Sequence, residues 1–517
     1  MEQAARAGDN MSIDVVEVKP SLQTERLWRW LAIGSLVLTV FGAKILFIRY
    51  FGSAVPYWDQ WDAEADILYK AYLNSNLSWS ALFAPHNEHR ILLTRLLSLL
   101  LFELDGGWDP ILQMMINAGL HVVAIVLIVL ALQRILGPGQ LVSLVAFSAA
   151  LFVLPIGWEN LLAGFQSQFY LLLIFTILAL SGFAVAPAFG ARWWISVAYA
   201  IAAFFSMASG ALIGAAALGI VVLQMLLRVR LGRKEYAGAA VLLIMSMVMI
   251  AFVPKVAGHD GLKAHGIGEL IRALLACLDY PRSGSFAGIL TNLPLLAYAY
   301  YVLKTRPPRT SPHWIVLSII VWWFGQILSL SYGRAVAPTS SRYLDIIIVA
   351  LPVNFAILLF AARTVSIDRQ HGLFIATAAW LVLILPGLVL NTASSGFPSV
   401  FEKAAQSSEQ QANVIEYIRT GSMAVLQNKP FLAIPYPSPE RLASLLSDPT
   451  IRMALPRLIR PTDVSDSAML DRTLLKGRFR PWFEQVKAVV LSLASLMLGL
   501  GLALAFMATF QKSHRRT

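Results

Sequence analysis

The clearest pattern along this chain is the recurrence of apolar runs, separated by short polar stretches. An apolar run of about 20 residues, wound as an α-helix, crosses the hydrocarbon core of a bilayer and satisfies its own backbone polar groups. The pattern therefore predicts an all-α polytopic membrane protein with about twelve transmembrane helices. The expected spans are residues 27–50, 111–136, 141–158, 168–186, 193–208, 211–227, 236–253, 286–302, 313–331, 344–361, 373–390 and 486–510.

The composition agrees with a membrane protein. Of the 517 residues, 57% are hydrophobic and 14% are charged, whereas soluble domains carry about 25% charged residues. The mean hydropathy is +0.66. Because Cys277 is the single cysteine, an internal disulfide and a cysteine metal site are excluded. Much of the net charge of +12 lies in short loops, where it sets membrane orientation, so we expect no nucleic acid partner.

Basic residues gather in the loops that follow alternate spans. Such loops face the cytoplasm, so twelve spans place both termini there. Residues 1–26 are expected to be a disordered cytoplasmic segment, 27–390 the membrane core, and 484–517 the last span with a basic cytoplasmic tail. The first outer loop, 51–110, and a small domain, 391–483, then share the opposite face. The basic residues are Arg26, Arg29, Arg228, Arg230, Arg233, Lys234, Lys304, Arg306, Arg309, Arg363, Arg369, Lys512, Arg515 and Arg516.

The segment 391–483 is the one insertion of the size of a soluble domain. Its apolar periodicity predicts a helix over 401–426, and Ser438 or Pro439 is expected to start another that continues through Leu446. This segment either covers the active site and receives an acceptor, or serves as a passive cap.

The first outer loop concentrates chemistry in an otherwise apolar protein. Two amphipathic helices are expected at the membrane interface, over 61–73 and 90–104. Acids, histidines and arginines held at a membrane surface suit a reaction on a phosphorylated, lipid-borne substrate. The residues concerned are Asp59, Asp62, Glu64, Asp66, His86, Glu88, His89, Arg90 and Arg95.

Three acids near the start of this loop are candidate catalytic bases: Asp59, Asp62 and Glu64. Glycosyl transfer from a polyprenyl-phosphate sugar needs a carboxylate that takes a proton from the acceptor hydroxyl, and fixed positive charge on the leaving phosphate. Asp59 and Asp62 are three residues apart, so a helix places them on one face, where each can raise the pKa of the other or both can share a cation. The acids fit equally well as caps of an interfacial helix.

His86, Glu88 and His89 are candidate substrate-binding residues. Two histidines three residues apart, without a further cluster of ligands, are weak evidence for a metal. A hydrogen-bonded structural cluster or an acceptor-binding site explains them better.

Two further outer segments carry candidate substrate contacts. Glu159 and Gln166 lie at span boundaries, where they either bind a sugar by hydrogen bonds or cap two helices. Arg334, Arg342 and Tyr343 lie in a short outer loop, against the positive-inside bias. These cations either bind a substrate phosphate, form a salt bridge to Asp59, Asp62 or Glu64, or extend their charged ends to the interface.

The order of these features resembles the GT-C superfamily of integral membrane glycosyltransferases, especially its protein-mannosyltransferase and aminoarabinose-transferase branch. The features are a long span, an outer loop with acids at its start, two interfacial helices flanking a His/Arg-rich turn at 85–90, and a second span ending at Arg134. The resemblance covers about the first 135 residues. It implies a catalytic aspartate at Asp59 or Asp62, although this chain lacks the adjacent acids that the family often has.

The sequence thus predicts a glycosyltransferase of a bacterial inner membrane, with its site facing the periplasm. The donor would be a polyprenyl-phosphate sugar and the acceptor a cell-envelope glycan, lipid or protein. No Asp-x-Asp motif or nucleotide-binding glycine motif is present, which favours the lipid-linked donor. Arg90, Arg334 and Arg342 would hold the leaving phosphate, so no cofactor is required, while a divalent cation is compatible with the acids. The alternatives are a lipid-linked oligosaccharide polymerase or ligase, and a transporter or flippase with charged residues inside its spans.

Overall fold

The computed structural model describes residues 22–282, 287–430 and 432–513, and this part of the chain is built from helices. Residues 1–21 of the predicted N-terminal segment, residue 286 of the predicted eighth span and residues 514–517 of the tail lie outside it. Nine helices in the described part are long and apolar enough to cross a membrane, so the prediction of an all-helical multi-pass protein is confirmed. They are Arg26–Phe51, Pro110–Ile135, Gly164–Phe183, Ala208–Leu226, Arg233–Ala251, His313–Gly333, Ser341–Thr364, Asp368–Thr420 and Arg480–Thr509.

Three of the twelve predicted spans form shorter helices. These are α6 (Leu141–Val153), α9 (Ala191–Phe204) and α14 (Leu293–Thr305), of 13, 14 and 13 residues. A perpendicular helix needs about 20 residues to cross a bilayer. The difference between nine candidate spans in the described residues and the predicted twelve therefore comes from these three helices.

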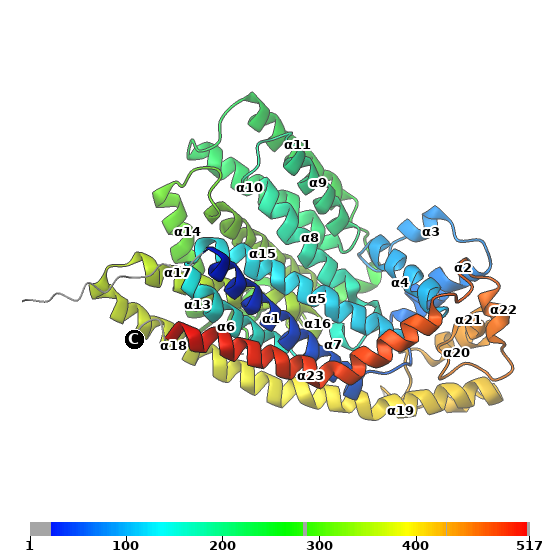
Figure 1. Cartoon of the computed structure of the whole chain (residues 1–517). Helices are drawn as coiled ribbons and strands as arrows, with labels where there is room; N and C mark the ends of the chain where they lie inside the picture. The colour runs from blue at the N-terminus through cyan, green and yellow to red at the C-terminus, as the bar shows by residue number, and fades with distance from the viewer. Residues whose placement is uncertain (1–21, 283–286, 431, 514–517) are drawn as a thin grey trace, which may run out of the picture.

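The first and last long helices of the described chain lie side by side. In Figure 1, α1 (Leu22–Phe51, blue) runs along α23 (Arg480–Ser513, red) on the surface of the bundle. Their backbones approach closely, since a Cβ added at Gly42 would lie 2.6 Å from the backbone nitrogen of Leu498. Small residues at such crossings let transmembrane helices pack by dispersion contacts.

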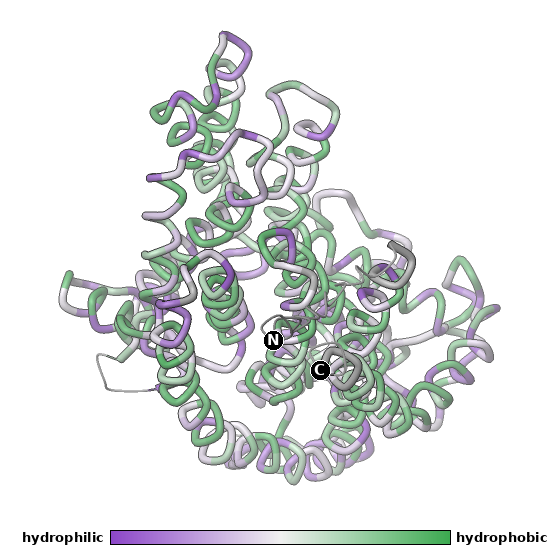
Figure 2. The backbone as a smooth tube through the Cα atoms, turned by 60° about the vertical axis from the view of Figure 1, so that its left-hand side comes forward, coloured by the Kyte–Doolittle hydropathy of each residue, from purple (hydrophilic) through white to green (hydrophobic). Residues whose placement is uncertain are grey.

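Behind this pair, further helices enclose one large hydrophobic core. Figure 2 shows hydrophobic residues along the helices of the bundle and hydrophilic residues gathered mainly at the turns. The main helices are α5 (Pro110–Leu132), α8 (Ser167–Phe183), α10 (Leu212–Leu226), α11 (Arg233–Ala251), α15 (His313–Gly333) and α17 (Ala350–Thr364).

The first loop forms the two helices that its periodicity predicts. The first is η1 (Trp61–Lys70), a π-helix continued by α2 (Ala71–Leu73), and the second is α4 (Leu92–Asp105). The short α3 (Trp79–Phe83) stands between them. A π-helix of this length is rare, and π-helical turns are frequent at functional sites.

The predicted domain boundary at residue 391 falls inside a continuous helix. α18 (Ile367–Asn391), the π-turn η7 (Thr392–Gly396) and α19 (Phe397–Thr420) follow one another as one helical segment. The segment after α19 lies beside the first loop at one end of the bundle (Figure 1). Its helices are α20 (Pro439–Ser447), α21 (Pro449–Ala454) and α22 (Asp466–Leu470).

This segment shares one hydrophobic cluster with the first loop. Trp61, Leu68 and Phe102 of the loop are buried together with Leu442 and Ile451 of the segment. Burial of about 25 cal/mol per Å² of apolar surface favours this association. Residues 391–483 are therefore not a separate body, because their apolar side chains complete the core of the loop.

We predict opposite effects for two glycine-to-alanine substitutions at the α1–α23 pair. At Gly42 the new methyl group meets the α23 backbone, so Gly42→Ala should destabilise the protein by about 1–3 kcal/mol. At Gly499 nothing lies within 4 Å, so Gly499→Ala should be neutral or stabilising through helix propensity. Melting temperatures of the variants purified in detergent measure this difference, and equal shifts for both would contradict the close approach.

Candidate active site

The first loop is organised around the carboxylate of Glu64, which is 1% exposed. It accepts hydrogen bonds from Ser98 (2.5 Å), Gln113 (2.7 Å), Gln60 (2.9 Å) and the indole nitrogen of Trp108 (3.2 Å). Burial raises the pKa of Glu64, and these four donors oppose the shift. Since the donors come from η1, α4, α5 and their connections, Glu64 joins the loop to the bundle and does not face a substrate.

Asp62 is occupied in a different way. It accepts from the Tyr436 hydroxyl at 2.5 Å and from the Arg441 guanidinium at 2.8 and 3.0 Å. Arg441 also pairs with Asp66 at 2.6 Å. These contacts join the segment after α19 to the outer side of η1. Asp62 therefore holds the segment after α19 against the first loop.

Asp59 is the most open of the three candidate bases. It lies in the turn before η1, and its side chain is 40% exposed. The His86 Nε2 atom lies 3.4 Å from its carboxylate. Burial alone would raise the pKa of Asp59, but His86 and the positive charge of Arg342 hold it below its ordinary value. Asp59 is therefore ionised at neutral pH and able to accept a proton.

Of the two interactions expected between Asp59 and Asp62, mutual raising of the pKa is not found at Asp59. The pKa of Asp59 is lowered rather than raised, and His86 and Arg342 are its neighbours. The two acids separate because Asp59 precedes the helix and turns toward His86, whereas Asp62 turns toward Arg441.

A tight turn presents the next three predicted residues. The backbones of His86 and His89 exchange hydrogen bonds of 2.8 and 3.0 Å around Asn87 and Glu88. Asn87 adopts a φ of 50°, which asparagine tolerates better than most residues. The turn places the Glu88 side chain toward α15, where Arg334 donates two hydrogen bonds of 3.0 and 2.8 Å.

Glu88 has a second partner, the Nδ1 atom of His259, at 2.6 Å. Burial raises the pKa of Glu88, but Arg334 and His259 more than offset it and lower the pKa to about 2. For His89, burial lowers the pKa to about 4, and its Nδ1 atom accepts from the Ala208 backbone at 3.4 Å. The turn is thus held by an ionised Glu88 and a neutral His89. No group of three or more metal-ligating side chains occurs among the described residues.

Arg342 brings a second ion pair to the same region. Its Nε atom lies 3.3 Å from Glu159, which also accepts from the Arg342 backbone at 3.1 Å. The adjacent Tyr343 accepts from Arg334 Nε at 3.0 Å. Both arginines therefore have carboxylate partners, as the salt-bridge interpretation predicted, but Glu88 and Glu159 are those partners rather than the acids at the start of the loop.

A buried polar cluster holds the backbone of Arg342 in place. Asn160, beside Glu159, donates to Asp345 at 2.9 Å and to the Arg342 carbonyl at 2.8 Å. Gly157 lets α7 (Trp158–Leu161) approach this carboxylate, because a Cβ there would lie 2.4 Å from Asp345. The cluster fixes α7 against α16 (Ser341–Ile347) and so positions the Glu159–Arg342 pair.

A cavity of about 530 Å³ adjoins this ion pair. Its walls combine an acid, hydroxyl and amide groups, and apolar surface, a mixture suited to a ligand that is polar at one end. The residues that line it include Glu159, Ser340, Ser341, Tyr280, Asn391, Thr392, Ser395, Ile156 and Leu344.

Two predicted substrate-binding residues are engaged elsewhere. Arg90 donates to the Phe83 carbonyl at 2.9 Å, and so caps α3. Gln166 accepts from Gln168 at 3.1 Å, next to the turn of η4 (Gly164–Gln166). The structure therefore gives both a local partner, and neither contributes to the Asp59, Glu88 and Arg342 network.

Contacts in the site between distant parts of the chain escaped sequence analysis. His259 lies 171 positions from its partner Glu88, and the Lys403 ammonium on α19 lies 5.0 Å from the Tyr57 ring centre. The sequence offered one signal for Asp345, which is that this acid lies one helical turn after Arg342 on a face that is buried. Long-range partners such as these leave no local pattern.

No family model, no curated protein and no solved structure matches this chain.

We predict that acidification loosens the turn at residues 86–89. The pKa of His89 is about 4 in the folded protein, against an ordinary 6.5, so folding disfavours its protonated form and stability falls as pH drops from 6.5 toward 4. The loss should not exceed about 3 kcal/mol. Below pH 4.5, protonation of Glu88 adds to it, because that pKa is lowered to about 2.

Amide hydrogen exchange of this turn, followed between pH 7 and 4, measures the effect. His89→Gln keeps a hydrogen-bond acceptor without a titrating ring and should abolish the dependence above pH 4.5. The matched control, His371→Gln on exposed α18, should retain it. Equal pH dependence in the wild type and His89→Gln would show that His89 is not the titrating group.

Proposed function

We propose that this protein is an integral membrane glycosyltransferase of the GT-C type, which moves a sugar from a polyprenyl-phosphate donor to a cell-envelope acceptor. The observation that carries the proposal is the position of Asp59, an ionised and accessible carboxylate influenced by the charge of Arg342. The cavity lined by Glu159, the ion-pair partner of Arg342, supplies adjoining polar and apolar surface. A lipid-linked sugar phosphate has the same division into polar and apolar parts.

The arrangement in the membrane follows from the distribution of basic residues. We propose that α6, α9 and α14 also cross or enter the bilayer, with tilt or local thinning, which gives twelve spans. Both termini then lie in the cytoplasm of a bacterial cell, and the first loop and residues 391–483 face the periplasm across the inner membrane.

Asp59 would act as the general base. As the acceptor oxygen bonds to the anomeric carbon of the donor sugar, its proton passes to the Asp59 carboxylate. The bond between the anomeric carbon and the phosphate oxygen breaks, and the bonding electrons leave with the polyprenyl phosphate. Asp59 loses the proton to water after the product departs.

Arg342 and Arg334 would stabilise the leaving phosphate. Each is now paired with a carboxylate, Glu159 or Glu88. When the sugar donor binds, the arginines would share their N–H groups between the carboxylates and the phosphate oxygens. Phosphate oxygens can accept two parallel hydrogen bonds from one planar guanidinium. A divalent cation bound with the donor would add to this charge, and activity measured with and without a chelator tests that addition.

A transporter or flippase is the second candidate, and one specific observation favours it. Lys44 (7% exposed), His121 (1%) and Asp345 (2%) are buried within candidate membrane spans. Ionisable groups inside a membrane bundle often line transport paths. The glycosyltransferase remains the better proposal, because Asp345 bonds to Asn160 under Arg342 and so has a structural role at the site.

We predict that Asp59→Asn lowers transfer by about 100-fold or more, since it removes the base while keeping the side-chain shape. Envelope glycans of cells carrying the variant, analysed by mass spectrometry, should match those of a deletion strain. Asp62→Asn should retain the product, because Asp62 binds Arg441 and Tyr436.

Asp260→Asn, on an exposed loop and paired with Lys263, is the matched control for loss of one acid and should leave the glycans unchanged. Membrane levels of each variant must equal the wild type. A wild-type profile from Asp59→Asn would overturn the assignment of the base. Unchanged glycans after deletion would overturn the glycosyltransferase proposal itself.

A further inference from the structure

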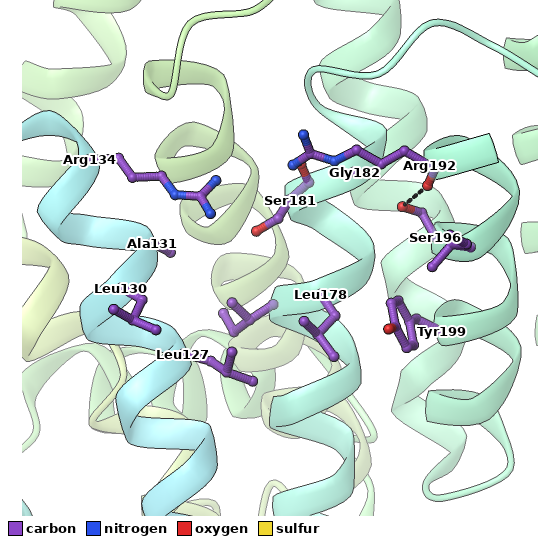
Figure 3. A pocket seen from close by; sticks show the side chains of 12 residues that line it. Leu127, Leu130, Ala131, Arg134, Leu178, Ser181, Gly182, Arg192, Ser196 and Tyr199 are labelled. Carbon is purple, nitrogen blue, oxygen red and sulfur yellow. Dashed lines mark hydrogen bonds between the residues drawn. The ribbon is translucent and has the colours of Figure 1, made fainter. Parts of the chain in front are cut away.

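A second cavity, of about 260 Å³, lies between α5, α8 and α9. Two arginines approach it from different sides, Arg134 after the end of α5 and Arg192 in the first turn of α9 (Figure 3). We refer to it as the Arg134–Arg192 pocket.

This pocket lies far from the candidate active site. Gln113, near the start of α5, contacts Gln60 and Glu64 of the first loop. Arg134 follows Gln113 by 21 residues, which at 1.5 Å per residue corresponds to about 30 Å along the helix. That distance equals the thickness of a bilayer's hydrocarbon core, about 30 Å. The pocket is thus at the opposite membrane boundary from Asp59.

The pocket carries positive charge without a matching acid. Within the described residues, Arg134 has no hydrogen-bond or ion-pair partner and Arg192 has no carboxylate partner. Arg192 donates one hydrogen bond to the Ser181 carbonyl at 2.8 Å. Arg134 is also subject to the positive charges of Arg192 and Arg29. Cations that repel one another at the end of a membrane bundle favour an anion between them.

The lower walls of the pocket are apolar. Figure 3 shows Leu127, Leu130 and Leu178 below the two arginines, with Tyr199 on the α9 side. Ile195, which also lines the pocket, is 51% exposed on α9. The pocket therefore has positive charge at its rim and apolar side chains beneath. A membrane lipid has the matching arrangement, with a polar headgroup above its acyl chains.

We propose that the Arg134–Arg192 pocket binds an anionic glycerophospholipid, with its phosphate between the two guanidinium groups and an acyl chain along Leu127, Leu130 and Leu178. Phosphate suits this position because arginine offers paired N–H donors to its oxygens. Clusters of basic residues at the membrane surface recognise anionic lipids by the same attraction. This inference is independent of the glycosyltransferase proposal.

The test uses the purified full-length chain in a neutral detergent. Native mass spectrometry follows the binding of phosphatidylglycerol, with phosphatidylcholine as the zwitterionic competitor. We expect the wild type to retain phosphatidylglycerol in preference, and the double variant Arg134→Ala/Arg192→Ala to bind it roughly tenfold more weakly. The control double variant, Arg233→Ala/Arg369→Ala, removes two exposed cations outside the pocket and should bind as the wild type does.

Three results would overturn the proposal. Equal weakening in both double variants would assign the binding to bulk charge, and equal retention of the two lipids by the wild type would remove the need for an anion. Protection of the wild type against thermal unfolding by millimolar inorganic phosphate, as strong as that by phosphatidylglycerol, would show that the apolar walls are unused. The lipid comparison on the wild type decides the matter even if the arginine variants fold poorly.

Discussion

The burial of the Glu64 carboxylate is the constraint on which the rest of the active-site region depends. An ionised or protonated carboxyl group withdrawn from water is costly unless the protein supplies its hydrogen bonds. Meeting that need draws Ser98, Trp108 and Gln113 to η1 and so ties together the first loop and the start of α5. The position of Asp59 is then set by the path of the chain, since Asp59 lies five residues before Glu64.

Three acids with similar local sequence have three different environments. Glu64 accepts hydrogen bonds from buried side chains, Asp62 pairs with Arg441, and the Asp59 side chain remains partly exposed beside His86. Local spacing could not separate them, because the deciding partner of Asp62 is 379 residues away in the chain. The same limit applies to Arg334, whose carboxylate partner is 246 residues distant.

The features of the fold that depend on local sequence pattern could be predicted from the sequence. Hydropathy located the helices of the bundle, and periodicity located η1 and α4 in the first loop. Turn chemistry located the start of α20, where the Ser438 side chain accepts from the Arg441 backbone as an N-cap. Residue 391 lies inside a continuous helical segment because a polar stretch can continue an apolar helix, as α19 continues α18 through a π-turn. Polarity marks where a chain leaves lipid rather than where a helix ends.

The contact between α1 and α23 has a consequence for biogenesis. Arg49 on α1 donates to a carbonyl on α23 that is 442 residues later in the chain. A ribosome adds about 5–20 residues per second, so α1 waits in the membrane for tens of seconds before its partner is made. During that interval the Gly42 face of α1 is open to lipid or to an insertion chaperone. Quality control that senses an unpaired α1 would therefore report on synthesis of the chain as far as α23.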